Sequence, residues 1–123
     1  MVSGIWFGTI TIDCTNPEKL CLFYFHLLGG KYCVLYDCPA LKHPSGVTLL
    51  FMKADFDFVP PVWPEEPGRQ QKQIHFDFDV SDLPAAVTRA EAFGAVKAKD
   101  QFGEGDWVTM FDPEGHPFCL CAQ

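Results

Sequence analysis

The sequence predicts an α+β fold made of two tandem βαβββ modules whose sheets face each other. Three observations predict it. Several short segments alternate apolar and polar residues, as strands do. Two other segments carry apolar residues at helical spacing. The halves also match at a constant separation, because Thr9 and Ile12 have counterparts 66 residues later in His75 and Phe78. A duplicated module with facing sheets follows naturally, since each sheet must cover one apolar face with its helix.

In the first half, residues 7–13 alternate in polarity and predict a strand. A helix is expected to begin after the cap residue Asn16 and to end at Gly29. Two further strands are predicted over residues 31–37 and 46–53, which are rich in apolar and aromatic side chains. This half therefore has the order strand, helix and strands.

The second half repeats this order. Residues 73–80 predict a strand, and a helix is expected between the cap residue Asp82 and Gly94. Further strands are predicted near 108–111 and 117–121. Each half is thus expected to form strand, helix and three strands, the third strand of the module having the weakest pattern.

Length and charge limit the function classes. The chain has 123 residues, which fits a single domain. We divide it into module 1 (5–53), a connecting loop (54–70) and module 2 (71–123). Its formal charge of −7 argues against nucleic acid and anionic membranes as partners, because both need a basic face. The longest apolar runs have about six residues, whereas a membrane span needs about 18.

The cysteines and the first residues of the sequence indicate the cellular compartment of the protein. The sequence has six cysteines: Cys14, Cys21, Cys33, Cys38, Cys119 and Cys121. No pair has the Cys-x-x-Cys spacing of a zinc ribbon or a redox pair. The first residues lack the basic and apolar regions of an export signal. We therefore expect a cytoplasmic protein with reduced thiols.

The connecting loop has an unusual composition. It contains four prolines and several aromatic residues, among them Trp63, whereas a flexible linker is rich in glycine and serine. Two interpretations stay open. The loop is either a packed segment that folds back over a site as a lid, or a stiff crossover between the modules.

Three sequence segments carry a resemblance to a known family: residues 11–24, 75–83 and 112–119, the last of which begins with Asp-Pro-Glu-Gly. Together they resemble the vicinal oxygen chelate superfamily, which includes glyoxalase I, bleomycin-resistance proteins and extradiol dioxygenases. The tract 61–72 is also similar to the central segment of glyoxalase-like domain proteins. The resemblance implies strongly curved mixed sheets that form one cleft, and a homodimer.

Metal-dependent members of that superfamily place ligands on the first and last strands of each module. By motif, the resemblance assigns these positions to Thr9, Leu50, His75 and Cys119. Only His75 is a ligand of the family type, and Cys119 stands where those enzymes commonly have Glu. A divalent site needs at least three good protein ligands, so a family-type metal centre is disfavoured and no cofactor is expected. His75 and Cys119 are the candidate ligands if a metal does bind.

Strand alternation places His75, Asp77 and Asp79 on one face, which we take as the cavity face. His75 and Asp77 are the candidate catalytic residues, because histidine suits proton transfer at neutral pH and a carboxylate can orient it. The alternative is that His75 is structural, bonded to Thr9 or to a backbone carbonyl. The acidic residues favour a cationic or hydrogen-bond-donating ligand.

The candidate ligand-binding residues lie on the cavity face or its rim: Thr9, Thr11, Leu50, Met52, Trp63, Trp107, Cys119 and Cys121. The sequence predicts a protein that binds a small organic molecule, of the type that the resemblance implies, without the full family metal site. A second hypothesis is a lyase, isomerase or dioxygenase-type enzyme acting on a small metabolite, with His75 as base or metal ligand. A third is a dimer module whose cleft is filled by its own side chains. His116 follows a turn and is expected to be exposed.

Overall fold

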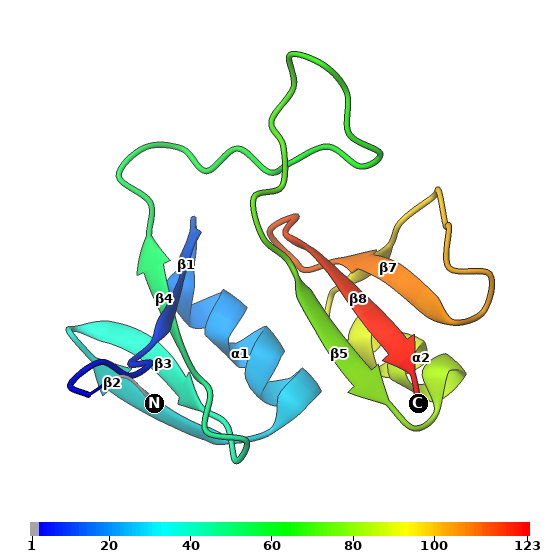
Figure 1. Ribbon diagram of the computed structural model, residues 1–123. Helices are drawn as coiled ribbons and strands as arrows, with labels where there is room; N and C mark the ends of the chain where they lie inside the picture. Colours follow the sequence, from blue (N-terminus) through cyan, green and yellow to red (C-terminus); the bar gives the residue numbers. More distant parts are fainter. Residues whose placement is uncertain (1–2) are drawn as a thin grey trace. The chain divides into compact units, whose positions relative to one another are not determined.

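The computed structural model describes residues 3–123, which form two modules of one helix and four strands each (Figure 1). The first contains β1 (Ile10–Cys14), α1 (Pro17–Leu28), β2 (Lys31–Leu35), β3 (Cys38–Lys42) and β4 (Thr48–Lys53). The second contains β5 (Phe76–Val80), α2 (Leu83–Ala92), β6 (Val96–Lys97), β7 (Trp107–Phe111) and β8 (Pro117–Ala122). The predicted α+β class and the βαβββ order of both halves are confirmed.

Each module has one mixed four-stranded sheet, and the two sheets have the same topology. The strand orders are β1-β4-β3-β2 and β5-β8-β7-β6. In both, the first and last strands of the module pair in parallel, and the remaining pairs are antiparallel. The register places Thr11 opposite Leu50 and Asp77 opposite Cys119. The internal repeat that the sequence predicts is therefore present in the strand order and in the pairing of the first and last strands.

Helix α1 has the termini that its sequence predicts. The Asn16 side chain accepts a hydrogen bond from the backbone N–H of Lys19 at 3.1 Å, and Pro17 occupies the first turn, where no N–H is needed. Gly29 ends the helix with φ 73°, a conformation that glycine adopts without strain, and its N–H bonds the carbonyl of Phe25. These caps fix where the chain leaves the helix to begin β2.

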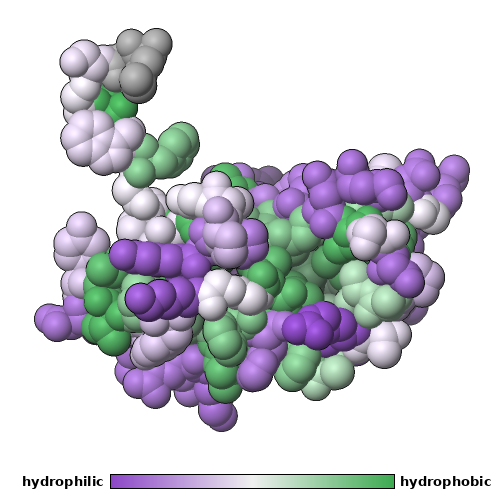
Figure 2. Space-filling model, turned by 90° about the horizontal axis from the view of Figure 1, so that it is seen from below, coloured by the Kyte–Doolittle hydropathy of each residue, from purple (hydrophilic) through white to green (hydrophobic). Residues whose placement is uncertain are grey.

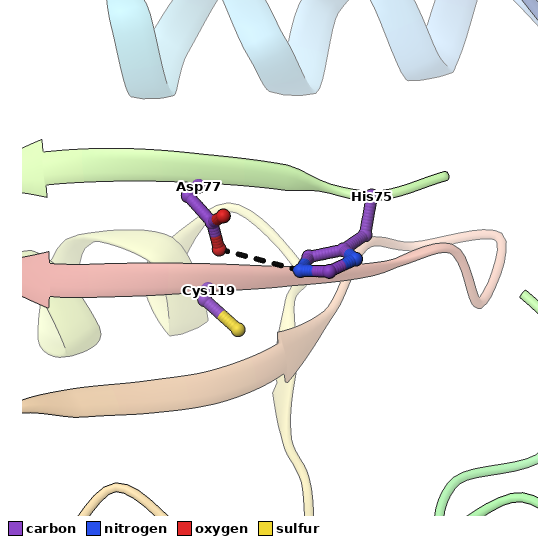
Figure 3. Close-up of side chains that lie close together, drawn as sticks. All are labelled: His75, Asp77 and Cys119. Atoms are coloured by element: carbon purple, nitrogen blue, oxygen red, sulfur yellow. Dashed lines mark ion pairs between the residues drawn. The ribbon is translucent and has the colours of Figure 1, made fainter. Parts of the chain in front are cut away.

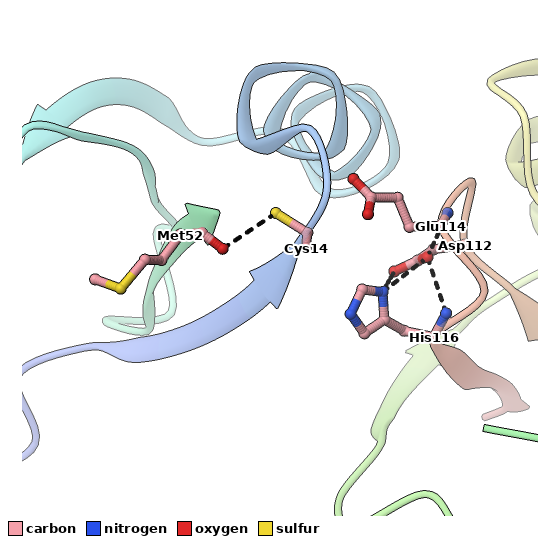
Figure 4. Close-up of polar contacts among 5 residues, drawn as sticks. All are labelled: Cys14, Met52, Asp112, Glu114 and His116. Atoms are coloured by element: carbon pink, nitrogen blue, oxygen red, sulfur yellow. Dashed lines mark hydrogen bonds and ion pairs between the residues drawn. The ribbon is translucent and has the colours of Figure 1, made fainter. Parts of the chain in front are cut away.

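The core of the first module lies between α1 and its sheet. The Tyr24 ring stacks on Phe51 of β4 at 5.8 Å and meets Phe23 edge-on at 4.9 Å, and all three side chains are buried. Burying an aromatic side chain of this size contributes roughly 1.5–3 kcal/mol. Beside this core, the Cys14 thiol donates to the carbonyl of Met52 at 3.6 Å, which ties β1 to β4 (Figure 4).

The second module repeats this packing with other side chains. Asp82 caps α2 by accepting from the N–H of Ala85 at 3.0 Å. Under the helix, Phe78 of β5 contacts the buried Phe118 of β8, with ring centroids 5.8 Å apart. Met110 of β7 is also fully buried. The apolar face of β5 thus packs inward, and its polar face stays open.

The first strand of each module begins later than predicted. The predicted strand 7–13 begins at Ile10, and the predicted strand 73–80 begins at Phe76. In the second sheet, extending the register would place His75 opposite Pro117, which has no N–H to donate to the ladder. His75 therefore precedes β5 instead of belonging to it.

The strands that the sequence marked least are β3 and β6. The predicted strand 31–37 ends early, because Tyr36 and Asp37 both have positive φ (52° and 60°) and turn the chain into β3. Two-residue hairpin turns need such φ values and usually contain Gly or Asn. A Tyr-Asp pair is therefore a weak sequence signal for a hairpin turn. In the second module, β6 has only two residues.

The chain divides into two compact units, Met1–Phe56 and Asp57–Gln123. Most of the predicted connecting loop (54–70) therefore belongs to the second unit. Phe58 stacks on His116, with ring centroids 4.4 Å apart, so this part of the loop packs on the second module.

The surface keeps several large apolar side chains. In the first unit Trp6, Phe7 and Tyr36 are more than four-fifths exposed, and Figure 2 shows apolar patches between hydrophilic ones.

All six cysteines are free. Within residues 3–123, no helix is long and apolar enough to cross a membrane.

Candidate functional site

An open cleft of about 680 Å³ lies on the polar face of the second module's sheet. The side chains that line its floor come from β5 and the residue before it, from β7 and from β8: His75, Asp77, Asp79, Thr109, Cys119 and Cys121. Along β5, the acidic residues are exposed, while the phenylalanines between them are partly buried. Simple strand alternation therefore brings the acidic residues to the cleft.

His75 and Asp77 lie side by side on this floor. The Nε2 atom of His75 is 3.4 Å from Oδ1 of Asp77, and the two side chains are 36% and 59% exposed (Figure 3). A contact between side chains as exposed as these contributes only about 0–1 kcal/mol to stability. The pair therefore orients the imidazole ring more than it holds the fold together.

Cys119 lies next to this pair, with its thiol largely buried. Burial raises the pKa of the Cys119 thiol, and the nearby Asp77 carboxylate raises it further. The Thr109 hydroxyl, 3.6 Å from the sulfur, and the Lys72 ammonium act in the opposite direction without reversing the shift. A thiol held protonated is a poor nucleophile, so the site does not favour Cys119 as one.

Cys121 shares this environment. Its pKa is raised by burial first and then by Asp77, Cys119 and Asp79. Both thiols of β8 are therefore neutral at physiological pH.

Three potential metal-ligating atoms meet on the floor. One ligand atom each from His75, Asp77 and Cys119 lies within 4.8 Å of the others (Figure 3). The parallel pairing of β5 with β8 places Asp77 beside Cys119, and His75 precedes Asp77 by two residues. The sequence named His75 and Cys119 as candidate ligands but did not add Asp77.

Aromatic side chains form the rim of the cleft. Trp63, Phe102 and Trp107 line it, and Trp63 meets Phe102 edge-on with ring centroids 5.9 Å apart. The Nζ atom of Lys72 lies 4.3 Å from the Trp63 ring centre and 2.8 Å from Oε1 of Glu65. Lys72 is thus held over the indole ring, and its charge is balanced by a carboxylate.

A glutamine side chain holds the rim loop to the sheet. The Gln101 amide bonds the backbone N–H and C=O of Thr109 at 2.9 and 2.8 Å. Gln101 directly precedes Phe102, so these bonds fix the start of the loop that carries that ring to the cleft.

A tight turn connects β7 and β8. The buried Asp112 carboxylate accepts from the N–H of Glu114 at 2.9 Å and from that of His116 at 3.0 Å, and its other oxygen lies 2.8 Å from His116 Nδ1 (Figure 4). The side chain of His116 is only 20% exposed, so the expectation of an exposed His116 is wrong. The carboxylate and the Phe58 ring cover it.

The remaining predicted ligand residues belong to the first module. Thr11 and Met52 are exposed, Thr9 is partly exposed and Leu50 is buried. Their assignment to a ligand stays a prediction.

Sequence reasoning missed Lys72 and Thr109. Thr109 shares a face of β7 with Trp107, so the same alternation that selected Asp77 would have found it. Lys72 precedes the strand, and only the folding of its loop brings it over Trp63.

The donor chemistry does not fit the four-ligand metal site that the resemblance implies. Thr9 offers a neutral hydroxyl, which is a poor ligand, and Leu50 offers hydrocarbon only. Cys119 offers sulfur where those enzymes commonly have a carboxylate. Only His75 matches the family pattern.

A family model identifies the family of this chain, and solved structures share its fold. The glyoxalase-like domain model matches residues 9–121, and no curated protein matches the chain. Among solved structures, a glyoxalase/bleomycin resistance protein/dioxygenase family enzyme from Burkholderia phytofirmans PsJN is 16% identical, with a TM-score of 0.70 over 93% of this chain and 95% of that chain. The fosfomycin resistance protein FosX from Listeria monocytogenes is 18% identical, with a TM-score of 0.69 over 100% of this chain and 93% of that chain. The chain therefore belongs to the glyoxalase-like domain family.

Proposed function

We propose that the protein binds a small organic molecule in the cleft of its second module. The observation that carries this proposal is the cleft itself, which is about 680 Å³ in volume and is rimmed by Trp63, Phe102 and Trp107. Ligand sites usually occupy about 300–1,000 Å³ and combine apolar walls with a few polar groups. A cleft of this size also argues against a module filled by its own side chains.

The lining favours a planar ligand that carries a positive charge or hydrogen-bond donors. Aromatic side chains stack on planar groups, and two carboxylates, those of Asp77 and Asp79, lie on the floor. Lys72 adds one positive charge, but Glu65 lies 2.8 Å from its Nζ and balances it. An anionic ligand would be repelled by the two floor carboxylates, and the Lys72 charge at the cleft is already balanced by Glu65.

This binding needs no metal ion, so the proposal holds whether or not one binds. It also includes the expected homodimer, which native mass spectrometry measures together with any ligand that copurifies. A monomeric mass would remove the dimer from the proposal and leave the cleft untouched.

One observation favours an enzyme as the second candidate. Nε2 of His75 lies 3.4 Å from Oδ1 of Asp77, which places the carboxylate near enough to orient the imidazole of a general base when the contact shortens. A lyase or isomerase reaction would then begin with His75 taking a proton from the bound metabolite, while Asp77 stabilises the imidazolium. If a substrate is found, the His75→Ala variant should lose turnover while still binding the substrate, and undiminished turnover would exclude this role.

The binding proposal is tested with two planar probes of equal ring size and opposite charge. We expect 9-aminoacridine, a cation, to bind saturably and at least tenfold more tightly than anthracene-9-carboxylate, an anion. Calorimetric titration in the presence of EDTA measures both affinities, and EDTA keeps metal ions out of the comparison. No saturable binding of either probe, or tighter binding of the anion, would contradict the proposal.

Two variants locate the binding. Trp63→Ala removes a rim aromatic and should weaken 9-aminoacridine binding at least tenfold. Phe56→Ala removes an aromatic side chain that is 89% exposed and outside the cleft lining, and it should leave the affinity unchanged. Equal effects of the two substitutions would mean that the probe binds exposed aromatic surface in general.

A further inference from the structure

We infer that the cleft floor holds a site for one thiophilic divalent ion, of which Zn²⁺ is the fitting example, with His75, Asp77 and Cys119 as its protein ligands. The site lies wholly within the second module and differs from the four-position set of the family. The inference rests on the proposed function only in that both use the same open cleft.

The distances suit a tetrahedral ion. Two nitrogen or oxygen ligands bound about 2.0 Å from such an ion lie about 3.3 Å apart, and a sulfur ligand lies about 3.5 Å from either. The Nε2 atom of His75 is already 3.4 Å from Oδ1 of Asp77. The three ligand atoms lie within 4.8 Å of one another, so small rotations about the Asp77 and Cys119 side-chain bonds complete the arrangement.

The fold supplies these three groups from rigid elements. Asp77 and Cys119 are direct partners in the parallel pairing of β5 with β8, and His75 lies two residues before Asp77 on the same face. The Thr109 hydroxyl, 3.6 Å from the Cys119 sulfur, can donate to a thiolate and orient it. Three protein ligands with an open side toward the cleft leave the fourth position for water or for a bound molecule.

The donor types select the metal. Imidazole, carboxylate and thiolate together suit Zn²⁺, whereas Mg²⁺, Ca²⁺ and Mn²⁺ prefer sets made of oxygen atoms. Asp77 supplies the third ligand that Thr9 and Leu50 do not provide. When the ion binds, the Cys119 sulfur forms the bond to the metal and its proton passes to the buffer.

The structure distinguishes these ligands from close neighbours. Asp79 and Cys121 also line the cleft, each two residues beyond a member of the cluster. Neither belongs to the ligand group found among residues 3–123. They therefore serve as matched controls, because they are of the same residue types on the same strands.

Cobalt(II) is the probe, because it takes the place of Zn²⁺ and its spectrum reports its ligands. We titrate the reduced, metal-free full-length chain with CoCl₂ in the absence of any organic ligand. One ion per chain should give a near-ultraviolet thiolate charge-transfer band and the visible bands of tetrahedral cobalt, and Zn²⁺ should abolish both. Cys119→Ser should abolish the charge-transfer band, and His75→Ala and Asp77→Asn should each weaken Co²⁺ binding at least tenfold.

The controls decide the outcome. Cys121→Ser and Asp79→Asn should keep the band and the affinity of the wild-type protein. The inference is overturned if no saturable band forms, if the band survives Cys119→Ser, or if Cys121→Ser removes it. Asp77→Asn changes a side chain that is 59% exposed and will fold, so undiminished Co²⁺ binding by this variant also overturns the inference.

Failure of this inference is separable from failure of the proposed function. The cobalt titration contains no organic ligand, and the 9-aminoacridine titration contains EDTA. Dye binding without a cobalt site refutes the metal site alone, and a cobalt site without dye binding refutes the proposed ligand alone.

Discussion

The side-chain amide of Gln101 bonds both backbone polar groups of Thr109. Its Oε1 accepts from the Thr109 N–H at 2.9 Å, and its Nε2 donates at 2.8 Å to the Thr109 carbonyl and at 2.8 Å to that of Ala98. Because β6 ends at Lys97, this side chain takes the place of a strand residue beside β7. It thereby positions Thr109, which contacts Cys119 on the cleft floor.

Replacing Gln101 by Glu should destabilise the fold. At pH 7 the carboxylate keeps the acceptor, loses both donors and brings a negative charge toward two carbonyl oxygens. We expect a loss of about 2–4 kcal/mol in the free energy of unfolding, measured by urea denaturation. At pH 4 the loss should be smaller, because a protonated carboxyl can donate one of the missing bonds. The exposed Gln70→Glu is the control, and an equal effect there would show that the bonds to Thr109 and Ala98 do not matter.

Alanine substitutions at two glycines distinguish the energetic cost of backbone strain from that of a steric contact. Gly105 and Gly115 have similar positive φ values of 92° and 97°, but a Cβ at Gly105 meets open space, whereas one at Gly115 lies 2.7 Å from the Cβ of Pro60. Gly105→Ala should cost about 1 kcal/mol. Gly115→Ala should cost about 2–4 kcal/mol, because a contact as close as this forces the backbone to shift. Thermal and urea unfolding measure both.

A double-mutant cycle completes this comparison. In a Pro60→Gly background the steric contact is gone, so Gly115→Ala should cost only as much as Gly105→Ala. An undiminished cost in that background would mean that the loop does not pack against the turn as the structure shows.

The buried Cys21 should make stability depend on pH in the alkaline range. Burial, and secondarily Cys33, raise the pKa of Cys21 from 9.0 to about 11. Between these values the folded protein holds a proton that the unfolded chain releases, so stability falls as pH rises from 9 to 11. The loss attributable to Cys21 should reach about 2–3 kcal/mol. Cys21→Ala lacks this group, so its free energy of unfolding should decline less steeply over that range, and identical slopes would contradict the prediction.

The two helix caps test whether the modules fold as one domain. Asn16→Ala and Asp82→Ala each remove a side chain that accepts a backbone N–H, and each should cost about 1 kcal/mol. Asn16→Asp and Asp82→Asn keep an acceptor and should cost much less. The sequence predicts a single domain, so both alanine variants should shift one common unfolding transition, followed by circular dichroism. Two transitions, each moved by only one variant, would refute the single domain.

Much of the fold could be predicted because its signals are local. Alternation along β5 assigns Asp77 and Phe78 to opposite faces without knowledge of any other strand. The caps Asn16 and Asp82 mark the helices through their own hydrogen-bonding chemistry. The internal repeat then predicts that both halves share one order of strands and helix, since the same pattern occurs twice.

What the sequence did not predict depends on contacts between distant residues. The Tyr36-Asp37 turn has positive φ angles at both residues, which the residue type Tyr in particular does not predict. Lys72 reaches Trp63 only because the loop between them folds back. Asp112 belongs to a recognised turn, but its burial beneath His116 depends on packing that no local pattern encodes.

The brevity of β6 has a consequence for association between chains. An exposed strand edge is a template on which another chain can add a strand, and proteins commonly protect such edges with short strands. In the second sheet the edge strand β6 has two residues, and the Gln101 side chain occupies the backbone groups of Thr109 beyond it. In the first sheet the corresponding edge strand β2 runs for five residues and exposes Tyr32 and Val34. Of these two edge strands, β2 is therefore the one that offers the longer template for an added strand.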